Sequence, residues 1–572
     1  MSPKLRIIRI PVHRQWPTVL LAMSVFALAS PGAAQVWGQW EQTHKLTADD
    51  AAAGNRLGIS VSISGGITIV GAFADDDACP GDYECFSGSA YLFNATTGEQ
   101  HHKLIAEDTA EGDSFGWSVS ISGDSAIVGA PFDDDNGGNS GSAYVFRRDQ
   151  DGAENWGEVR KLTAIDAALN DGFGRSVAIS NSIAIVGAAG VDDACPGNPD
   201  CDSGSAYIFR RDRGGVDNWG EFLKLTSSDA AESDRFGWSV AISGNVAIVG
   251  APLDDDACPD DPDCNSGSAY LFDVTTGQQL HKLIADDADG NPEGSFYGDF
   301  FGASVAISGG VAIVGVFRDD DACSDNPNCD SGSAYVFDVA TGQQLHKLTA
   351  HDGTAEDFFG SSVAISGGIA IVGSRQHDDA GHNSGSAYMF DVATGQQLDK
   401  LNARDAEPAD EFGLGVAISS DRIIVGARLV DDACPGEPNC NSGAAYIFAP
   451  SDSCEDEDGD GLVTICHIPP GNPENAHTIT VGVDAVPAHL AHGDHCGPCE
   501  GDSSLLMGDR SDADQEHHSA DLDDSGDVGA ADLAELLGAW GLNPGHPADL
   551  DGDGNVGPLD LALVLGNWGP CE

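Results

Sequence analysis

Hydrophobic and polar residues alternate along most of this chain in short runs. One unit recurs: S-V-x-I-S, a turn, A-I-V-G, an acidic loop, S-G-S-A-Y-x-F, a second turn and a stretch that ends in Lys-Leu. Alternation with a period of two between Gly- and Asp-rich turns predicts β-strands, so each unit predicts four strands. The units open on Phe-Gly or Leu-Gly, 53 to 65 residues apart, at Leu57, Phe115, Phe173, Phe236, Phe301, Phe359 and Phe412.

Repetition of a four-stranded unit limits the possible folds. A unit of this kind cannot bury both faces alone, so neighbouring units stack, and about four to eight of them close into a β-propeller. The sequence therefore predicts a mainly β fold, a seven-bladed β-propeller over residues 35–450.

The ends of the repeat region predict how the ring closes. Lys-Leu marks the fourth strand at Lys45, Lys103, Lys161, Lys224, Lys282, Lys347 and Lys400, and the first of these precedes the first Leu-Gly. The seventh unit has no such strand. We therefore expect residues 37–47 to supply the outer strand of the last blade, which removes an open sheet edge.

The repeated motifs carry a resemblance. F-G-x-S-V-A-I-S, A-I-V-G-A-P and S-G-S-A-Y-V-F resemble the FG-GAP repeat, the unit of the integrin α-chain head and of many secreted bacterial propellers, over residues 37–450. The calcium-binding version of that repeat has a D-x-D-x-D-G loop between its first two strands. Here the same gap holds only short turns such as Gly65-Gly66, which argues against integrin-like calcium sites and calcium-dependent adhesion in the blades.

Charge and the N-terminal segment indicate the compartment. Residues 1–34 read as a secretory signal peptide, because Lys and Arg residues precede an apolar stretch at 19–29 and small residues follow at 32–34. No later stretch has the length of apolar residues that a membrane helix needs. The net charge of −66 argues against nucleic acid as a partner, since phosphate binding needs clustered cations. The acidity fits either solubility or binding of cations and cationic ligands.

Cysteines recur in the acidic loops. Of the fifteen cysteines, ten form five C-x5-C pairs, which we expect to be disulfides of an exported protein: Cys79–Cys85, Cys195–Cys201, Cys258–Cys264, Cys323–Cys329 and Cys434–Cys440. Blades two and six lack both cysteines, as bonded pairs predict. A Cys/Asp metal site is the alternative. The pairing of the remaining five does not follow from the sequence: Cys454, Cys466, Cys496, Cys499 and Cys571.

Two acidic positions repeat with the blades. An Asp or Asn stands two residues before each Phe-Gly or Leu-Gly, from which a short acceptor can bond turn amides. An Asp also follows each repeat Lys by five residues, from Asp50 to Asp405. Because both positions recur in every blade, we interpret them as turn and ion-pair devices rather than as active sites.

Beyond Pro450 the composition changes. Residues 451–500 resemble a short Cys/His-rich cassette of secreted bacterial proteins, and residues 501–519 read as a linker. His489, His492 and His495, with Asp494 and the cysteines, have the spacing to hold a transition metal such as Zn²⁺ or Cu²⁺. A module tied by disulfides is the alternative, and the role of the cassette does not follow from its residues.

Two twelve-residue loops near the C-terminus have the pattern of calcium ligands. Oxygen donors stand at positions 1, 3, 5, 7 and 12, with Gly at 6 for the sharp turn. The residues are Asp521, Asp523, Ser525, Asp527 and Asp532 in the first loop, and Asp549, Asp551, Asp553, Asn555 and Asp560 in the second. Each loop runs into an apolar segment that predicts a helix. Residues 520–572 thus predict a small α-helical, EF-hand-like domain that binds Ca²⁺ and resembles a type I dockerin, which implies docking onto a cohesin-like partner.

Together these features predict a secreted or cell-surface binding or scaffold protein that is not an enzyme. The propeller loops would present a surface for a protein or glycan ligand, and the calcium-loaded tail would mediate attachment. The alternative is an extracellular polysaccharide-active propeller enzyme carried on a dockerin. Trp156 and Trp219 stand in the longer hairpins of blades two and three, where they either stack on a sugar or pack against the protein.

Overall fold

The computed structural model divides into two compact units, Met1–Asp458 and Gly459–Glu572. In the first unit it describes residues 40–79, 85–150, 152, 154–195, 198, 201–255, 265–287, 298–320, 329–434 and 440–450. In the second it describes 462–467, 477–482, 485–486, 495–496, 527–528, 541–542, 555–556 and 569–570. The predicted signal peptide and the linker at 501–519 lie outside these residues.

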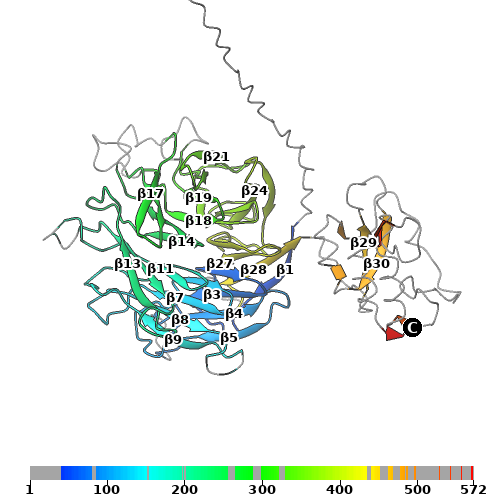
Figure 1. The fold of residues 1–572 in the computed structure, drawn as a ribbon, viewed down its shortest axis with the longest axis horizontal. Helices are drawn as coiled ribbons and strands as arrows, with labels where there is room; N and C mark the ends of the chain where they lie inside the picture. Colours follow the sequence, from blue (N-terminus) through cyan, green and yellow to red (C-terminus); the bar gives the residue numbers. More distant parts are fainter. Residues whose placement is uncertain are drawn as a thin grey trace, which may run out of the picture. The chain divides into compact units, whose positions relative to one another are not determined.

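Seven four-stranded antiparallel sheets build the first unit, which confirms the seven-bladed propeller (Figure 1). Blades one to three are β2 (Val61–Ser64), β3 (Ile67–Ala72), β4 (Ser89–Asn94), β5 (Gln100–Leu104); β6 (Ser118–Ser122), β7 (Ser125–Ala130), β8 (Ser142–Arg147), β9 (Gly157–Leu162); and β10 (Ser176–Ser180), β11 (Ile183–Ala188), β12 (Ser205–Arg210), β13 (Gly220–Leu225).

The remaining blades repeat this order. Blades four to six are β14 (Ser239–Ser243), β15 (Val246–Ala251), β16 (Ser268–Asp273), β17 (Gln278–Leu283); β18 (Ser304–Ser308), β19 (Val311–Val316), β20 (Ser333–Asp338), β21 (Gln344–Leu348); and β22 (Phe359–Ser366), β23 (Ile369–Ser374), β24 (Ser386–Asp391), β25 (Gln397–Leu401). Blade seven joins β26 (Gly415–Ile418), β27 (Ile423–Ala427) and β28 (Ala444–Pro450) to β1 (Trp40–Leu46).

The strand β1 closes the ring. It runs antiparallel to β28, with Trp40 opposite Pro450 and Leu46 opposite Ala445, and Figure 1 shows the two strands side by side. Leu46 is completely buried in the core. The predicted closure is thus confirmed for residues 40–46, whereas residues 37–39 lie outside the described part of the chain.

The first strand of each blade belongs to an inner ring. The strands β2, β6, β10, β14, β18, β22 and β26 contact one another in this order, and β26 contacts β2. Side-chain hydrogen bonds join neighbouring blades there: Ser118 Oγ donates to the carbonyl of Gly174 at 2.8 Å. Blade seven has Gly415 at the position of this serine, so the same hydroxyl link is missing where the ring closes.

The Phe-Gly motif packs neighbouring blades together. Within blade two, the ring of Phe115 meets Tyr144 and Phe146 edge-on, at centroid distances of 5.4 and 5.9 Å, and it shares a core cluster with Leu92 of blade one. Gly116 has a φ of +88°, and a Cβ there would lie 2.1 Å from the carbonyl oxygen of Ser89 in the preceding blade. A side chain at this position would therefore separate the two blades.

The acidic residue before Phe-Gly bonds the preceding turn, as the sequence predicts. Asp113 Oδ2 accepts a hydrogen bond from the Ala110 amide, and Asp234 Oδ2 accepts one from the Ala231 amide, both at 2.7 Å. Burial raises the pKa of Asp234 to about 7, and the nearby charge of Asp254 adds to this effect. These carboxylates hold the segments that cross from one blade to the next.

The second unit contains short paired strands. A three-stranded sheet comprises β29 (Leu462–His467), β30 (His477–Gly482) and β31 (His495–Cys496). Farther along, β32 (Asp527–Val528) pairs with β35 (Gly569–Pro570), and β33 (Gly541–Leu542) pairs with β34 (Asn555–Val556). The segments predicted as helices in the tail lie outside the described residues. Among the residues described, no helix has both the length and the apolar character of a membrane span.

Candidate functional site

A lysine in the outer strand of each blade lies among carboxylates, and we call this arrangement the lysine cluster. In blade one, Lys103 Nζ lies 2.7 Å from Asp50 Oδ2 and 3.0 Å from Asp75 Oδ2, and it also contacts Asp77. Asp75 is only 1% exposed. The Tyr91 hydroxyl lies 2.6 Å from Asp75 and 2.9 Å from Asp50, beneath the ammonium group.

The lysine cluster recurs around the ring. Its other members are Lys161 with Asp108, Asp133 and Asp135; Lys224 with Asp166 and Asp193; Lys282 with Asp229 and Asp254; Lys347 with Asp287 and Asp319; Lys400 with Asp352 and Asp379; and Lys45 with Asp405 and Asp432. The Asp five residues after each Lys forms an ion pair, as predicted. Its partner is the lysine of the following blade.

The buried acidic position varies between blades. Asp75, Asp133, Asp254 and Asp319 occupy it in four blades, Val191 and Val430 in two, and His377 in blade six. His377 Nδ1 lies 2.9 Å from Asp357 Oδ2, and Lys400 Nζ lies 2.8 Å from His377 Nε2. The imidazole thus takes the place of a carboxylate beside the lysine.

Three groups have the donors of a cation site. Their ligand atoms lie within 4.8 Å of one another: Asp75, Asp76 and Asp77; Asp108, Asp133 and Asp135; and Asp352, His377 and Asp379. Each group contacts a lysine of the lysine cluster. Burial lowers the pKa of Lys103, but its hydrogen bonds to Asp50 and Asp77 and the charge of Asp75 outweigh burial and raise it. An ammonium group thus places a positive charge beside the carboxylates of each group.

The acidic loops contain disulfides. The structure contains the bonds Cys79–Cys85, Cys195–Cys201 and Cys434–Cys440, and Cys329 is disulfide-bonded. Cys258, Cys264 and Cys323 lie outside the described residues. Several disulfides in one chain indicate an extracellular or otherwise oxidising environment.

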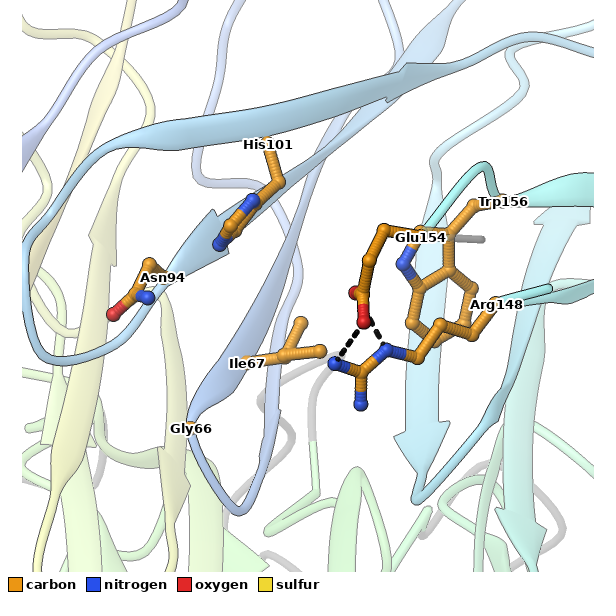
Figure 2. A pocket seen from close by; sticks show the side chains of 7 residues that line it. All are labelled: Gly66, Ile67, Asn94, His101, Arg148, Glu154 and Trp156. Carbon is orange, nitrogen blue, oxygen red and sulfur yellow. Dashed lines mark hydrogen bonds and ion pairs between the residues drawn. The ribbon is translucent and has the colours of Figure 1, made fainter. Parts of the chain in front are cut away.

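The two hairpin tryptophans pack against the protein. Trp156 and Trp219 are 3% and 2% exposed and belong to the cores of neighbouring blades, so neither presents a ring face to a sugar. Trp156 also borders a pocket of ≈ 390 Å³, which Figure 2 shows from close by. Arg148 lines this pocket and donates two hydrogen bonds of 2.7 Å to Glu154. The acid in this pocket is thus held in an ion pair.

A second arrangement of side chains was not predicted from the sequence. Trp117, Arg175 and Trp238 follow Phe-Gly in three successive blades, directly before β6, β10 and β14. Arg175 Cζ lies 3.6 Å from the centroid of Trp238 and 5.8 Å from that of Trp117. Because all three residues precede strands of the inner ring, they lie at the same end of it. We call these residues the Trp–Arg–Trp stack.

The predicted sites of the second unit are described only in part. Asp527 and Asn555 lie in β32 and β34, whereas the other eight predicted calcium ligands lie outside the described residues. His495 lies in β31 opposite Cys466 in β29, and His489 and His492 are outside the described residues. Cys466 is disulfide-bonded, which favours the disulfide-tied reading of the cassette over a metal site that uses this thiol.

Comparison with known proteins agrees with the geometry of the first unit. The model of the FG-GAP repeat matches residues 40–93, 99–146, 156–209, 219–272, 278–337, 343–390 and 396–448. Each match begins at the start of an outer strand or one residue before it and ends in the third strand of the next blade, as the closure through β1 requires. No curated protein matches the chain. Since the seven matches cover more than half of its length, the chain belongs to the FG-GAP repeat family.

Proposed function

We propose that this protein is an exported, non-catalytic binding or scaffold protein. Its propeller presents a surface to a protein or glycan ligand, and its C-terminal tail attaches it to a partner through Ca²⁺. The FG-GAP propeller is a binding and scaffold fold, and the N-terminal residues together with the disulfides support export. The parts of the proposal rest on different observations and are tested separately.

The proposal of a non-catalytic role rests on the similarity of the blades. Catalysis by acid and base needs groups in contrasting environments, with their pKa values pushed apart. In the described part of the propeller, the buried carboxylates instead recur from blade to blade, bound to a lysine or to a turn amide. Glu154, the acid beside the pocket, is engaged by Arg148. This arrangement supports a scaffold better than a single reaction centre.

The attachment role rests on the duplicated loops. Asp527 and Asn555 occupy the seventh position of their loops, where an EF-hand-type loop offers a backbone carbonyl to calcium. The strand that follows Trp540 pairs with the second loop, and the strand that follows Trp568 pairs with the first. This reciprocal pairing supports a module built from two equivalent halves. By its resemblance to a type I dockerin, we expect it to bind a cohesin-like protein.

A binding experiment with product analysis tests the non-catalytic role. The full chain is applied to an array of plant and bacterial polysaccharides, and the supernatant is analysed for shortened chains. We expect retention on some surfaces without release of products. If cleavage products appear in proportion to the concentration of the protein, the alternative holds and the protein is a polysaccharide-active enzyme.

Attachment is tested with an immobilised cohesin module. We expect the full chain to bind in millimolar Ca²⁺ and to be released by EDTA. Asp521→Ala with Asp549→Ala removes the first ligand of both loops and is expected to abolish binding. Asp49→Ala with Asp286→Ala removes the same charge from exposed positions of the propeller and is expected to bind normally. Equal binding by both double variants would remove the docking role.

A further inference from the structure

Arg175 is an unpaired cation in a strongly acidic protein. The chain has 92 Asp and Glu residues against 26 Lys and Arg, and each lysine of the lysine cluster contacts at least two carboxylates. Arg175 is half-buried, and among the described residues it makes no ion pair and its Nε has no hydrogen-bond partner. Partial burial of a charge without a carboxylate partner costs free energy, so the retention of Arg175 calls for an explanation.

The surroundings of Arg175 raise this cost. Burial lowers the pKa of its guanidinium to about 10, and the positive charge of Arg235 adds to the effect. Arg235 itself reaches one carboxylate, Asp202, at 3.4 Å. The faces of Trp117 and Trp238 attract the guanidinium, but cation–π contacts contribute far less than the desolvation of an ion costs.

In the opposite sector of the ring a similar arrangement has a carboxylate nearby, although among the described residues Arg375 also makes no ion pair and its Nε has no hydrogen-bond partner. There Arg375 Cζ lies 5.3 Å from the ring centroid of Phe358. Burial lowers the pKa of Arg375, and the negative charge of Glu411 partly offsets this effect. Glu411 is buried and accepts a hydrogen bond of 2.8 Å from Arg428.

Glu411 stands directly before Phe-Gly in blade seven. At the same position, blades two, three and four have Ser114, Gly172 and Arg235. The sector that holds the Trp–Arg–Trp stack therefore has no carboxylate of its own at this position. Both sectors have an arginine stacked on aromatic rings, but the sector of Arg175 lacks a carboxylate equivalent to that of Glu411.

We propose that Arg175, with Arg235 and the rings of Trp117 and Trp238, forms a binding site for a carboxylate that a ligand supplies. The planar guanidinium matches a carboxylate through two parallel hydrogen bonds, and the indole rings provide apolar walls beside it. The ligand class is thus an organic acid or an acidic side chain that carries an apolar or aromatic group next to its carboxylate.

The net charge of the protein narrows the ligand further. A chain of charge −66 repels polyanions at long range, so one carboxylate on an otherwise uncharged or cationic ligand is favoured over a polyuronate or a nucleic acid. This inference rests on the proposed binding role of the propeller and names its ligand class. The calcium experiments measure the tail, so either part can fail without the other.

The test compares a carboxylate with its uncharged amide. Calorimetry or ligand-observed NMR on the full chain measures the affinity for benzoate and for benzamide. We expect benzoate to bind about tenfold or more tightly, because a charge-assisted hydrogen bond to the guanidinium is lost in the amide. Arg175→Gln should abolish this preference. Arg375→Gln, which removes a stacked arginine from the sector that has its own Glu411, should retain it.

Two further measurements complete the test. Thermal unfolding shows whether each variant is folded, and benzoate should raise the melting temperature of the natural protein and of Arg375→Gln, but not of Arg175→Gln. The peptides acetyl-Phe-Glu-Phe-amide and acetyl-Phe-Gln-Phe-amide identify the source: preference for the Glu peptide assigns a protein side chain, and preference for benzoate alone assigns a small acid. Equal affinity for acid and amide in both pairs, or an unchanged preference in Arg175→Gln, would overturn the proposal.

Discussion

Lys103 Nζ lies 2.7 Å from Asp50 Oδ2, although 53 residues separate them in the sequence. Asp50 belongs to the segment that leaves β1 of the last blade, and Lys103 belongs to the outer strand of the first. The ion pair therefore joins the two blades where the ring closes. The same relationship recurs between Lys161 and Asp108 and so on around the propeller.

Replacing Lys103 with Met should destabilise the propeller strongly. The buried carboxylate of Asp75 loses its cation, and breaking a buried pair in this way costs about 3–5 kcal/mol. The control is Lys224→Met in blade three, where Val191 occupies the place of the buried Asp and no such charge is stranded. Chemical denaturation of both variants measures the difference, and an equal loss in the two would refute the role of the buried carboxylate.

Asp234→Asn should stabilise the protein at alkaline pH. The pKa of Asp234 is about 7 in the folded protein, above its ordinary value of 3.8, so its contribution to stability is present below about pH 3.8 and is lost as pH rises through about 7. Asn keeps an acceptor for the Ala231 amide and carries no charge. We expect a gain of about 1–3 kcal/mol at pH 8 that shrinks towards pH 5.

Calorimetric unfolding of the natural protein and Asp234→Asn at both pH values measures this gain. Blade one already has Asn55 at the equivalent position, so an amide has room there, although Asn55 Oδ1 has no hydrogen-bond partner. A gain that does not depend on pH would contradict the assigned titration.

Deleting residues 37–47 should leave the last blade without its outer strand. The backbone edge of β28 and the core residues around Leu46 would then face solvent, which favours aggregation. We expect oligomers in size-exclusion chromatography and a lower melting temperature. Glu41→Ala, at an exposed position of the same strand, should change neither. A deletion variant that stays monomeric and melts like the natural protein would exclude closure through β1.

The blades could be predicted from the sequence because local patterns determine them. Phe115-Gly116 and its six equivalents predicted the number of units, and the offset between Lys-Leu and Phe-Gly predicted that β1 closes the ring. Contacts between blades were harder to predict from the sequence. Asp50 was expected in an ion pair, but the choice of Lys103 depends on how one blade rotates relative to the next, which no local pattern contains.

Other parts of the candidate site depend on packing around the ring. For Trp156 the sequence did not decide between stacking on a sugar and packing against the protein. An aromatic residue in a hairpin is compatible with both roles until its burial is known. The Trp–Arg–Trp stack was not predicted, since Trp117, Arg175 and Trp238 are 58 and 63 residues apart and meet only through the inner ring of strands.

Calcium titration of the full chain tests the central claim, that the two loops of the C-terminal tail bind Ca²⁺. Calorimetry should find two Ca²⁺ sites in the natural protein that disappear in Asp521→Ala with Asp549→Ala, because each variant loop has lost its first carboxylate ligand. Asp49→Ala with Asp286→Ala, the exposed control pair, should retain both sites. Titrations that are identical in all three proteins, or no calcium binding at millimolar concentration, would contradict the account.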